Sequence, residues 1–247
     1  MSRIAFISDI HSNIDALESV LADIDSQAVD SIICLGDVVG YGAEPAACVR
    51  RVFEHCAVTV LGNHEAMLSI LHTINDWELG ATVRVPLHLA KEQLSEAEFD
   101  AVCSLPLVAD ISPIVAVHSS LDEPAAFHYI DDLDRAARNF AAQARWHVCF
   151  HGHTHYPLIW EKRGATTIMH PPSEHRVRLA PESKYTINVG SVGQPRDEDP
   201  RACYAIYDVE ENLFLHRRVT YDIQMARTRI VRAKLPANNG LRLILGR

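Results

Sequence analysis

The feature that most constrains the fold is a series of short apolar runs, each followed at once by polar residues. Early in the chain these runs occupy 4–7, 31–35 and 57–61, and they lead into Asp9-Ile10-His11, Gly36-Asp37 and Gly62-Asn63-His64. Segments with the apolar spacing of helices follow the first two runs, from about Ile14 and from Pro45. Strands that alternate with helices predict a parallel sheet. Because ligands bind beyond the carboxyl ends of such strands, the polar residues mark a candidate site.

The second half of the chain continues this pattern and then changes. The run 114–117 leads into His118, and the run 148–150 leads into His151-Gly152-His153-Thr154-His155. From residue 158 onward the pattern favours short strands with antiparallel pairing, at 158–161, 165–169, 176–179, 185–189, 202–208 and 213–219. A hairpin turn is expected at 210–212, a last helix at 222–234 and a tail at 235–247.

Residues 66–105 interrupt the sheet with a mainly helical segment. Ser95 and Glu98 form the sequence signature of a capping box at the start of one helix. The segment is either a cap over the site or a helix pair that packs on one face. With no low-complexity linker and no internal repeat, residues 1–247 are expected to form a single domain.

Composition limits the partners and the compartment. The 247 residues carry a net charge of −9, which disfavours non-specific binding to nucleic acid or to an anionic membrane. A nucleotide substrate is still allowed, because bound cations reverse the sign locally. The six cysteines are scattered without a C-x-x-C pair, as expected of reduced thiols. The N-terminal apolar run is too short for a signal peptide, and no run approaches the ~20 apolar residues of a membrane span. A cytoplasmic protein is therefore expected.

Each polar cluster has an ordinary explanation when it is taken alone. Asp-x-His occurs by chance, Gly-Asp is a common turn, Asn63 could cap a helix, and a lone His118 could be a satisfied core histidine. Five such clusters at the ends of predicted strands are harder to explain separately. Imidazole is the commonest metal-ligating side chain, so the combination indicates a metal site.

The order of these clusters resembles the calcineurin-like metallophosphoesterase superfamily, and the resemblance covers residues 4 to about 208. The segments 36–42 and 188–196 further resemble its bacterial and archaeal phosphodiesterase-like branch. The resemblance implies a four-layer αββα sandwich of two mixed β-sheets flanked by helices. It assigns one metal to Asp9, His11 and His155 and the other to Asn63, His118 and His153, with Asp37 as the bridge.

Mixed oxygen and imidazole ligands suit Mn, Fe, Zn or Ni rather than Mg or Ca. A bridging carboxylate holds two ions roughly 3.5–4 Å apart, and water between them loses a proton near neutral pH. The expected reaction is hydrolysis of a P–O bond by in-line attack of this bridging hydroxide. His64, assigned to neither metal, is expected to protonate the leaving group.

The substrate class is less constrained than the reaction. Gly40 and Tyr41 replace the Asp-Arg pair of the protein serine/threonine phosphatases in the superfamily, so the guanidinium that suits a dianionic monoester is absent there. We therefore expect a phosphodiesterase that acts on a small phosphoester, nucleotides included. Tyr41 and Arg196 are candidate substrate contacts. A phosphomonoesterase or a dinucleoside polyphosphate hydrolase is the alternative. A non-catalytic metal-binding scaffold is disfavoured, because it need not keep His64. The sequence fixes no oligomeric state.

Overall fold

The computed structural model describes residues 3–74, 78–170 and 176–247. In its first sheet, the three strands from the N-terminal part of the chain run parallel to one another. A strand from the C-terminal part pairs with the first of them in antiparallel orientation. The order across this sheet is β3 (Val58–Thr59), β2 (Ser31–Cys34), β1 (Arg3–Ile7), β11 (Ala202–Asp208), β12 (Leu213–Val219) and β9 (Arg176–Arg178). The predicted strand at 57–61 is thus only two residues long, at the sheet edge.

The second sheet is also mixed. Strands β5, β6 and β10 run parallel, while the hairpins on either side of them are antiparallel. The order is β4 (Val108–Ile111), β5 (Ile114–Val117), β6 (Val148–His151), β10 (Lys184–Asn188), β7 (Leu158–Arg163) and β8 (Thr166–His170). β4 was not among the strands predicted from the sequence. Its alternation is weak, and none of its residues is fully buried.

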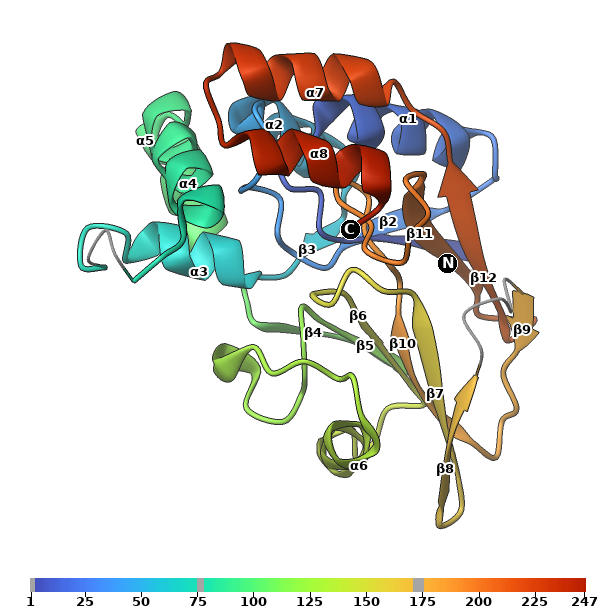
Figure 1. The fold of residues 1–247 in the computed structure, drawn as a ribbon. Helices are drawn as coiled ribbons and strands as arrows, with labels where there is room; N and C mark the ends of the chain where they lie inside the picture. The colour runs from blue at the N-terminus through green and yellow to red at the C-terminus, as the bar shows by residue number, and fades with distance from the viewer. Residues whose placement is uncertain (1–2, 75–77, 171–175) are drawn as a thin grey trace.

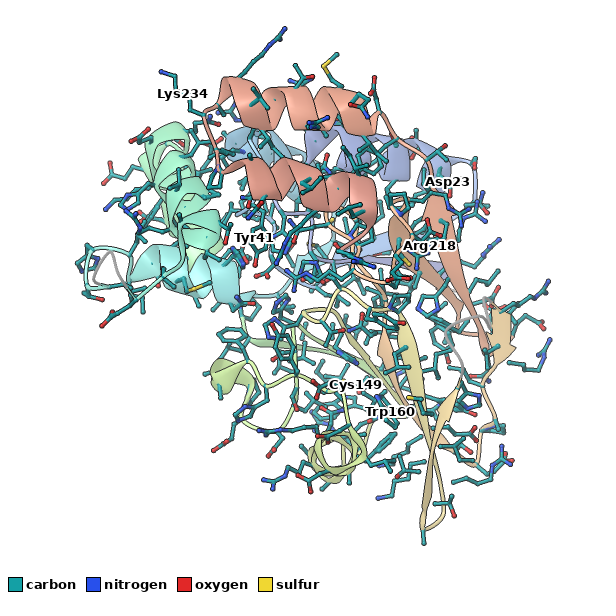
Figure 2. All side chains as sticks on the ribbon, in the orientation of Figure 1. Asp23, Tyr41, Cys149, Trp160, Arg218 and Lys234 are labelled. Carbon is teal, nitrogen blue, oxygen red and sulfur yellow. The ribbon has the colours of Figure 1, made fainter. Side chains whose placement is uncertain are left out.

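The two sheets pack face to face and helices cover their outer faces (Figure 1). Phe6 of β1 stacks on Phe150 of β6 with ring centroids 4.0 Å apart, in the core between the sheets. Helices α1 (Ile14–Asp25) and α2 (Pro45–His55) pack on the first sheet. Helix α6 (Leu133–Ala142) covers the second sheet, where its Phe140 packs with the buried Trp160. Figure 2 shows Trp160 near this helix. This arrangement confirms the predicted αββα sandwich.

The described residues between 63 and 103 form three helices, in agreement with the mainly helical segment expected from the sequence. They are α3 (Asn63–Ser69), α4 (Ala81–Gln93) and α5 (Glu96–Cys103), which begins with the predicted Ser95–Glu98 capping box. Both α4 and α5 contact α2, and Leu87, Ala90 and Val102 join the core shared with α1 and α2. A short 3₁₀ helix, η1 (Pro124–Ala126), lies between β5 and α6.

The C-terminal segment differs from the prediction. The tail expected at 235–247 contains helix α8 (Ala237–Leu245), which pairs with α7 (Ile223–Arg232) as a helical hairpin. Buried Gly240 lets α8 approach Arg227 of α7 closely. The amide of buried Asn239 donates to the backbone carbonyls of Tyr41 and Thr82. α8 is therefore part of the packed structure and reaches the loop after β2 (Figure 1).

Two further expectations concern cysteines and membranes. All six cysteines are free thiols, as their scattered spacing suggested. Throughout the described part of the chain, the helices are too short or too polar to cross a bilayer.

Candidate metal centre

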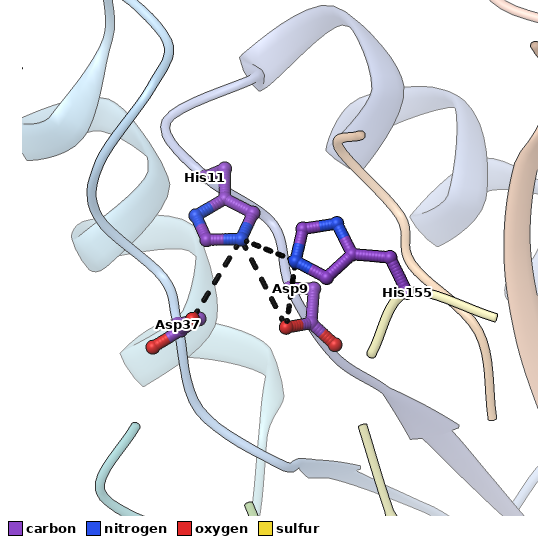
Figure 3. Close-up of side chains that lie close together, drawn as sticks. All are labelled: Asp9, His11, Asp37 and His155. Carbon is purple, nitrogen blue, oxygen red and sulfur yellow. Dashed lines mark hydrogen bonds and ion pairs between the residues drawn. The ribbon is translucent and has the colours of Figure 1, made fainter. Parts of the chain in front are cut away.

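The carboxyl ends of strands from both sheets bring the predicted ligands together. Asp9 and His11 follow β1, Asp37 follows β2, and His155 lies beyond β6 (Figure 3). Nε2 of His11 lies 3.0 Å from Nε2 of His155, 3.8 Å from Asp9 Oδ1 and 3.7 Å from Asp37 Oδ2. These four side chains are buried and offer ligand atoms within 4.8 Å of one another. They form the first ligand group.

A second group shares Asp37 with the first. Nε2 of His118 lies 3.3 Å from Asp37 Oδ2, 3.1 Å from Asn63 Oδ1 and 3.2 Å from His153 Nδ1. Asn63 is the first residue of α3 rather than its cap, and its side chain points at His118. Asp37 Oδ2 thus faces a histidine of each group, and Oδ1 accepts the backbone N–H of His64 at 2.9 Å.

Hydrogen bonds fix the orientation of the histidine rings. Nδ1 of His11 lies 3.1 Å from the carbonyl of Val39, and Nδ1 of His155 lies 2.6 Å from the carbonyl of Gln194. A carbonyl only accepts, so we infer that both Nδ1 atoms carry the proton. Both Nε2 atoms then present lone pairs to each other at 3.0 Å. Such an arrangement is repulsive without a cation between the rings.

The electrostatics of the cluster point the same way. Burial, aided by nearby positive groups, lowers the pKa values of His11 and His155 far below their usual range, so both rings are neutral. Burial raises the pKa of Asp9 to about 7, and its Oδ1 is buried with no hydrogen-bond partner in the described residues. A buried acceptor without a donor is costly, and a cation would satisfy it. The residues present therefore fit divalent metal ions.

Asp37 and His118 form the charged centre of the cluster. Burial opposes charge on Asp37, but the surrounding histidines, His118 first, hold its pKa well below the usual range. Burial likewise opposes charge on His118, but the Asp37 carboxylate raises its pKa to about 9. Asp37 is thus an anion that attracts positive charge from both sides.

Backbone strain is concentrated at these ligands. The φ angles of Asp9, His11, Asp37, His153 and His155 are 53°, 49°, 52°, 69° and 60°, in the left-handed region that most residues avoid. Strain of about 1–3 kcal/mol per residue persists only where the surrounding structure imposes it, and it clusters at functional sites. Gly152 also has no room for a side chain, because a Cβ there would lie 2.4 Å from Asp9 Oδ2.

Glu65 holds the Asp37 loop in this conformation. It is fully buried on α3, and its two oxygens accept three backbone N–H groups, from Asp37 at 2.9 Å, Val39 at 3.0 Å and Gly62 at 3.1 Å. Burial, together with the nearby Asp37 charge, raises its pKa to about 7. The sequence reasoning did not give Glu65 this role, although its place directly after His64 was a signal.

Asn188 supports the histidine loop in a similar way. It ends β10, and its amide nitrogen lies 2.5 Å from the carbonyl of Gly152 and 3.0 Å from Thr154 Oγ1. Its Oδ1 accepts the backbone N–H of Gly190 at 2.9 Å. Asn188 therefore ties the segment that carries His153 and His155 to the second sheet.

His64 lies beside the cluster and belongs to neither ligand group. Its Nε2 is 4.0 Å from Asp37 Oδ2, and its Nδ1 is buried without a partner among the described residues. Gly40 occupies the space next to Nδ1, since a Cβ at Gly40 would lie 2.1 Å from it. Burial lowers the pKa of His64. With Gly40 in place of an acid, Nδ1 of His64 has no carboxylate beside it in the described part of the chain.

Tyr41 and Arg196 meet at one side of the cluster. The Tyr41 ring lies 4.6 Å from the His11 ring and 4.7 Å from the His64 ring, between centroids. Arg196 Nη2 lies 3.4 Å from the Tyr41 hydroxyl, and its guanidinium lies 5.7 Å from the Tyr41 ring centroid. Figure 2 places Tyr41 beneath α8. Both candidate substrate contacts therefore adjoin the predicted ligands.

Comparison with known proteins agrees with this arrangement. A family model described as the calcineurin-like phosphoesterase superfamily domain matches residues 2–212. The chain belongs to this superfamily. Its fold and motif order thus confirm the resemblance seen in the sequence.

Relatives in the superfamily match the whole chain. An uncharacterized protein of Methanocaldococcus jannaschii is 34% identical over 252 residues, which cover 100% of this chain and 99% of that protein. A crystal structure of a metallophosphoesterase from Sphaerobacter thermophilus has a TM-score of 0.86 at 34% identity, covering 100% and 99%. A hypothetical protein from Pyrococcus horikoshii OT3 shares the fold, with a TM-score of 0.80 at 18% identity over 100% and 99%.

Proposed function

We propose that this chain is a two-metal phosphoesterase of the phosphodiesterase type. The observation that carries the proposal is the position of Asp37 Oδ2, 3.7 Å from Nε2 of His11 and 3.3 Å from Nε2 of His118. One carboxylate oxygen that faces both ligand groups is what a pair of ions with a shared ligand needs. The superfamily supports the wider assignment to phosphoester hydrolysis.

The proposed ligands divide as the two groups do. One ion takes Asp9, His11, Asp37 and His155, and the other takes Asp37, Asn63, His118 and His153. The donor set of imidazole, carboxylate and amide oxygen suits Mn, Fe, Zn or Ni. When bound, such a pair supplies positive charge to the phosphoryl oxygens and makes water nucleophilic near neutral pH.

The chain's own contribution to proton transfer is assigned to His64. Its Nε2 side faces Asp37 and the cluster, and its Nδ1 side is closed by Gly40. A proton held at Nε2 is in position to pass to the leaving-group oxygen, whose departure it assists. The donating form is the imidazolium, and loss of its Nε2 proton to the leaving-group oxygen leaves a neutral imidazole that keeps its proton at Nδ1.

The substrate is proposed to be a small phosphodiester, nucleotides included. Tyr41 offers an aromatic face beside the cluster against which an organic group can pack, and Arg196 offers positive charge. Within the described residues, α4 and α5 pack on α2, which favours a packed helix pair over a cap above the site. A phosphomonoesterase or a dinucleoside polyphosphate hydrolase is the second candidate, favoured by that same Arg196. A scaffold role is disfavoured by the His64 position.

The test compares three substrates with the Mn-loaded protein. Bis-p-nitrophenyl phosphate should be hydrolysed with a higher kcat/KM than p-nitrophenyl phosphate, and a phosphoserine peptide poorly or not at all. A clear preference for either monoester would overturn the diesterase assignment. The absence of turnover on all phosphoesters, with metals bound, would favour the scaffold.

A further inference from the structure

Helix α8 brings a second arginine to the side of the site where Arg196 lies. The side-chain oxygen Oε1 of Gln194 is 3.2 Å from Arg196 Nη2 and 3.5 Å from Arg242 Nη1. Two guanidinium groups therefore converge on one neutral acceptor. Because like charges repel, this convergence needs a compensating interaction.

Neither guanidinium has a carboxylate partner within residues 3–74, 78–170 and 176–247. Nε of Arg196 is moreover buried without any hydrogen-bond partner in that part of the chain. The same helical hairpin shows the alternative, since Arg229 lies 3.0 Å from both Asp15 Oδ2 and Glu44 Oε1. Arg242 is exposed, but Arg196 is a partly buried cation without a counter-ion. That state is unfavourable, and an anionic ligand would relieve it.

The arginine pair is connected directly to the ligand groups. The backbone carbonyl of Gln194 accepts from Nδ1 of His155, while its side chain faces both arginines. Arg196 also reaches the Tyr41 hydroxyl, and the Tyr41 ring adjoins His11. Arg242 is linked to the cluster through Gln194. The pair therefore extends away from the cluster toward the exposed side of α8.

We propose that Arg196 and Arg242 form a second anion site that binds a phosphate next to the one that is hydrolysed. This inference rests on the proposed two-metal phosphoesterase and favours its second candidate substrate class, compounds with a neighbouring phosphate or similar anion, such as nucleoside or dinucleoside polyphosphates. Planar guanidinium groups suit this task, because each can donate two hydrogen bonds to phosphate oxygens. The charge that Gly40 and Tyr41 lack is then supplied by arginines on the side of the cluster where Tyr41 lies.

The test measures binding as well as turnover. Calorimetry on the full chain with excess Mn compares methylenediphosphonate, which carries two phosphonates, with methylphosphonate, which carries one. Arg242→Gln should weaken methylenediphosphonate binding roughly 10- to 100-fold, the range for one charge-assisted hydrogen bond, and affect methylphosphonate much less. Equal effects on both ligands, or none, would reject the second anion site.

Arg232→Gln is the matched control, because Arg232 lies exposed on α7 and its loss changes the net charge equally. It should alter neither affinity. An equal loss of methylenediphosphonate binding in Arg232→Gln would show a general charge effect and reject the site. Thermal unfolding of both variants checks that the hairpin is still folded.

Turnover separates this inference from the proposed function. In Arg242→Gln, kcat/KM for a dinucleoside tetraphosphate should fall at least tenfold relative to kcat/KM for bis-p-nitrophenyl phosphate. If the wild-type protein hydrolyses both substrates and Arg242→Gln leaves the ratio of the two kcat/KM values unchanged, the second anion site is rejected. The proposed phosphoesterase activity is then still supported. The protein could instead bind methylenediphosphonate through Arg242 and hydrolyse neither substrate. That result would contradict the proposed phosphoesterase activity and support the second anion site.

Discussion

Replacing Glu65 by Gln tests whether the Asp37 loop is held by one buried carboxylate. Glutamine has the same size but can accept at only one of its two terminal atoms. If its oxygen takes the place of Oε2, it keeps the N–H groups of Asp37 and Gly62, and its NH₂ then opposes the N–H of Val39. One charge-assisted hydrogen bond is lost and two donors face each other. The free energy of unfolding should therefore fall by about 3 kcal/mol.

The expected cost converts to a measurable shift. For a chain of this size about 3 kcal/mol lowers Tm by roughly 6–12 °C. Activity should fall by about 100-fold, because a displacement of about 1 Å in a catalytic group has that effect. Differential scanning calorimetry without metal and kcat with Mn are the assays.

Glu98→Gln is the matched control for Glu65→Gln. Glu98 holds the equivalent third position of α5 and also accepts from the N–H of its own cap residue, Ser95. It is partly exposed, and its other partner is the exposed Arg50, so its replacement should cost about 1 kcal/mol or less and leave kcat unchanged. If the two variants lose the same stability and keep the same kcat, Glu65 does not position Asp37.

Two more predictions concern proton transfer and acid stability. His64→Ala should retain metal and lower kcat roughly 10²–10⁴-fold, with a smaller loss for substrates with good leaving groups. A loss that does not vary with leaving-group pKa, measured over a series of aryl esters, would assign His64 to binding instead. The hydrogen bonds from Arg217 hold the pKa of Asp23 below its usual range, so this pair stabilises the fold above the unfolded pKa and loses that effect as pH falls. Asp23→Asn should therefore cost about 0.5–1 kcal/mol at pH 7 and progressively less below about pH 4 in urea unfolding, and a difference that does not change with pH would contradict this.

The residues of the candidate metal centre could be identified from the sequence because their signal is local. Each of Asp9, Asp37, Asn63 and His118 follows an apolar strand within a few residues, and parallel strands place their carboxyl ends at one edge. The two mixed sheets likewise follow from the motif resemblance, whereas the strand order within them was not predicted from the sequence. Strand lengths at the edges, such as β3, depend on pairing partners that the local sequence does not show.

The supporting residues could not be predicted, since their partners are distant in the chain. Glu65 binds backbone groups 28 and 26 residues earlier, and backbone N–H groups leave no mark on the sequence. Helix α8 was missed because Asn239 and Gly240 favour a turn locally, whereas tertiary packing against α7 and the Tyr41 loop favours a helix. With α8 assigned to a tail, Arg242 had no predicted place beside the site.

The most direct test of the account is the metal content of Asp37→Asn. Elemental analysis after Mn loading and dialysis should find two ions per wild-type chain. Asp37→Asn should lose both ions or nearly all activity, because its charge serves both groups, whereas Asp9→Asn should lose the ion of one group. Two tightly held ions and near-normal turnover in folded Asp37→Asn would contradict the shared-carboxylate site.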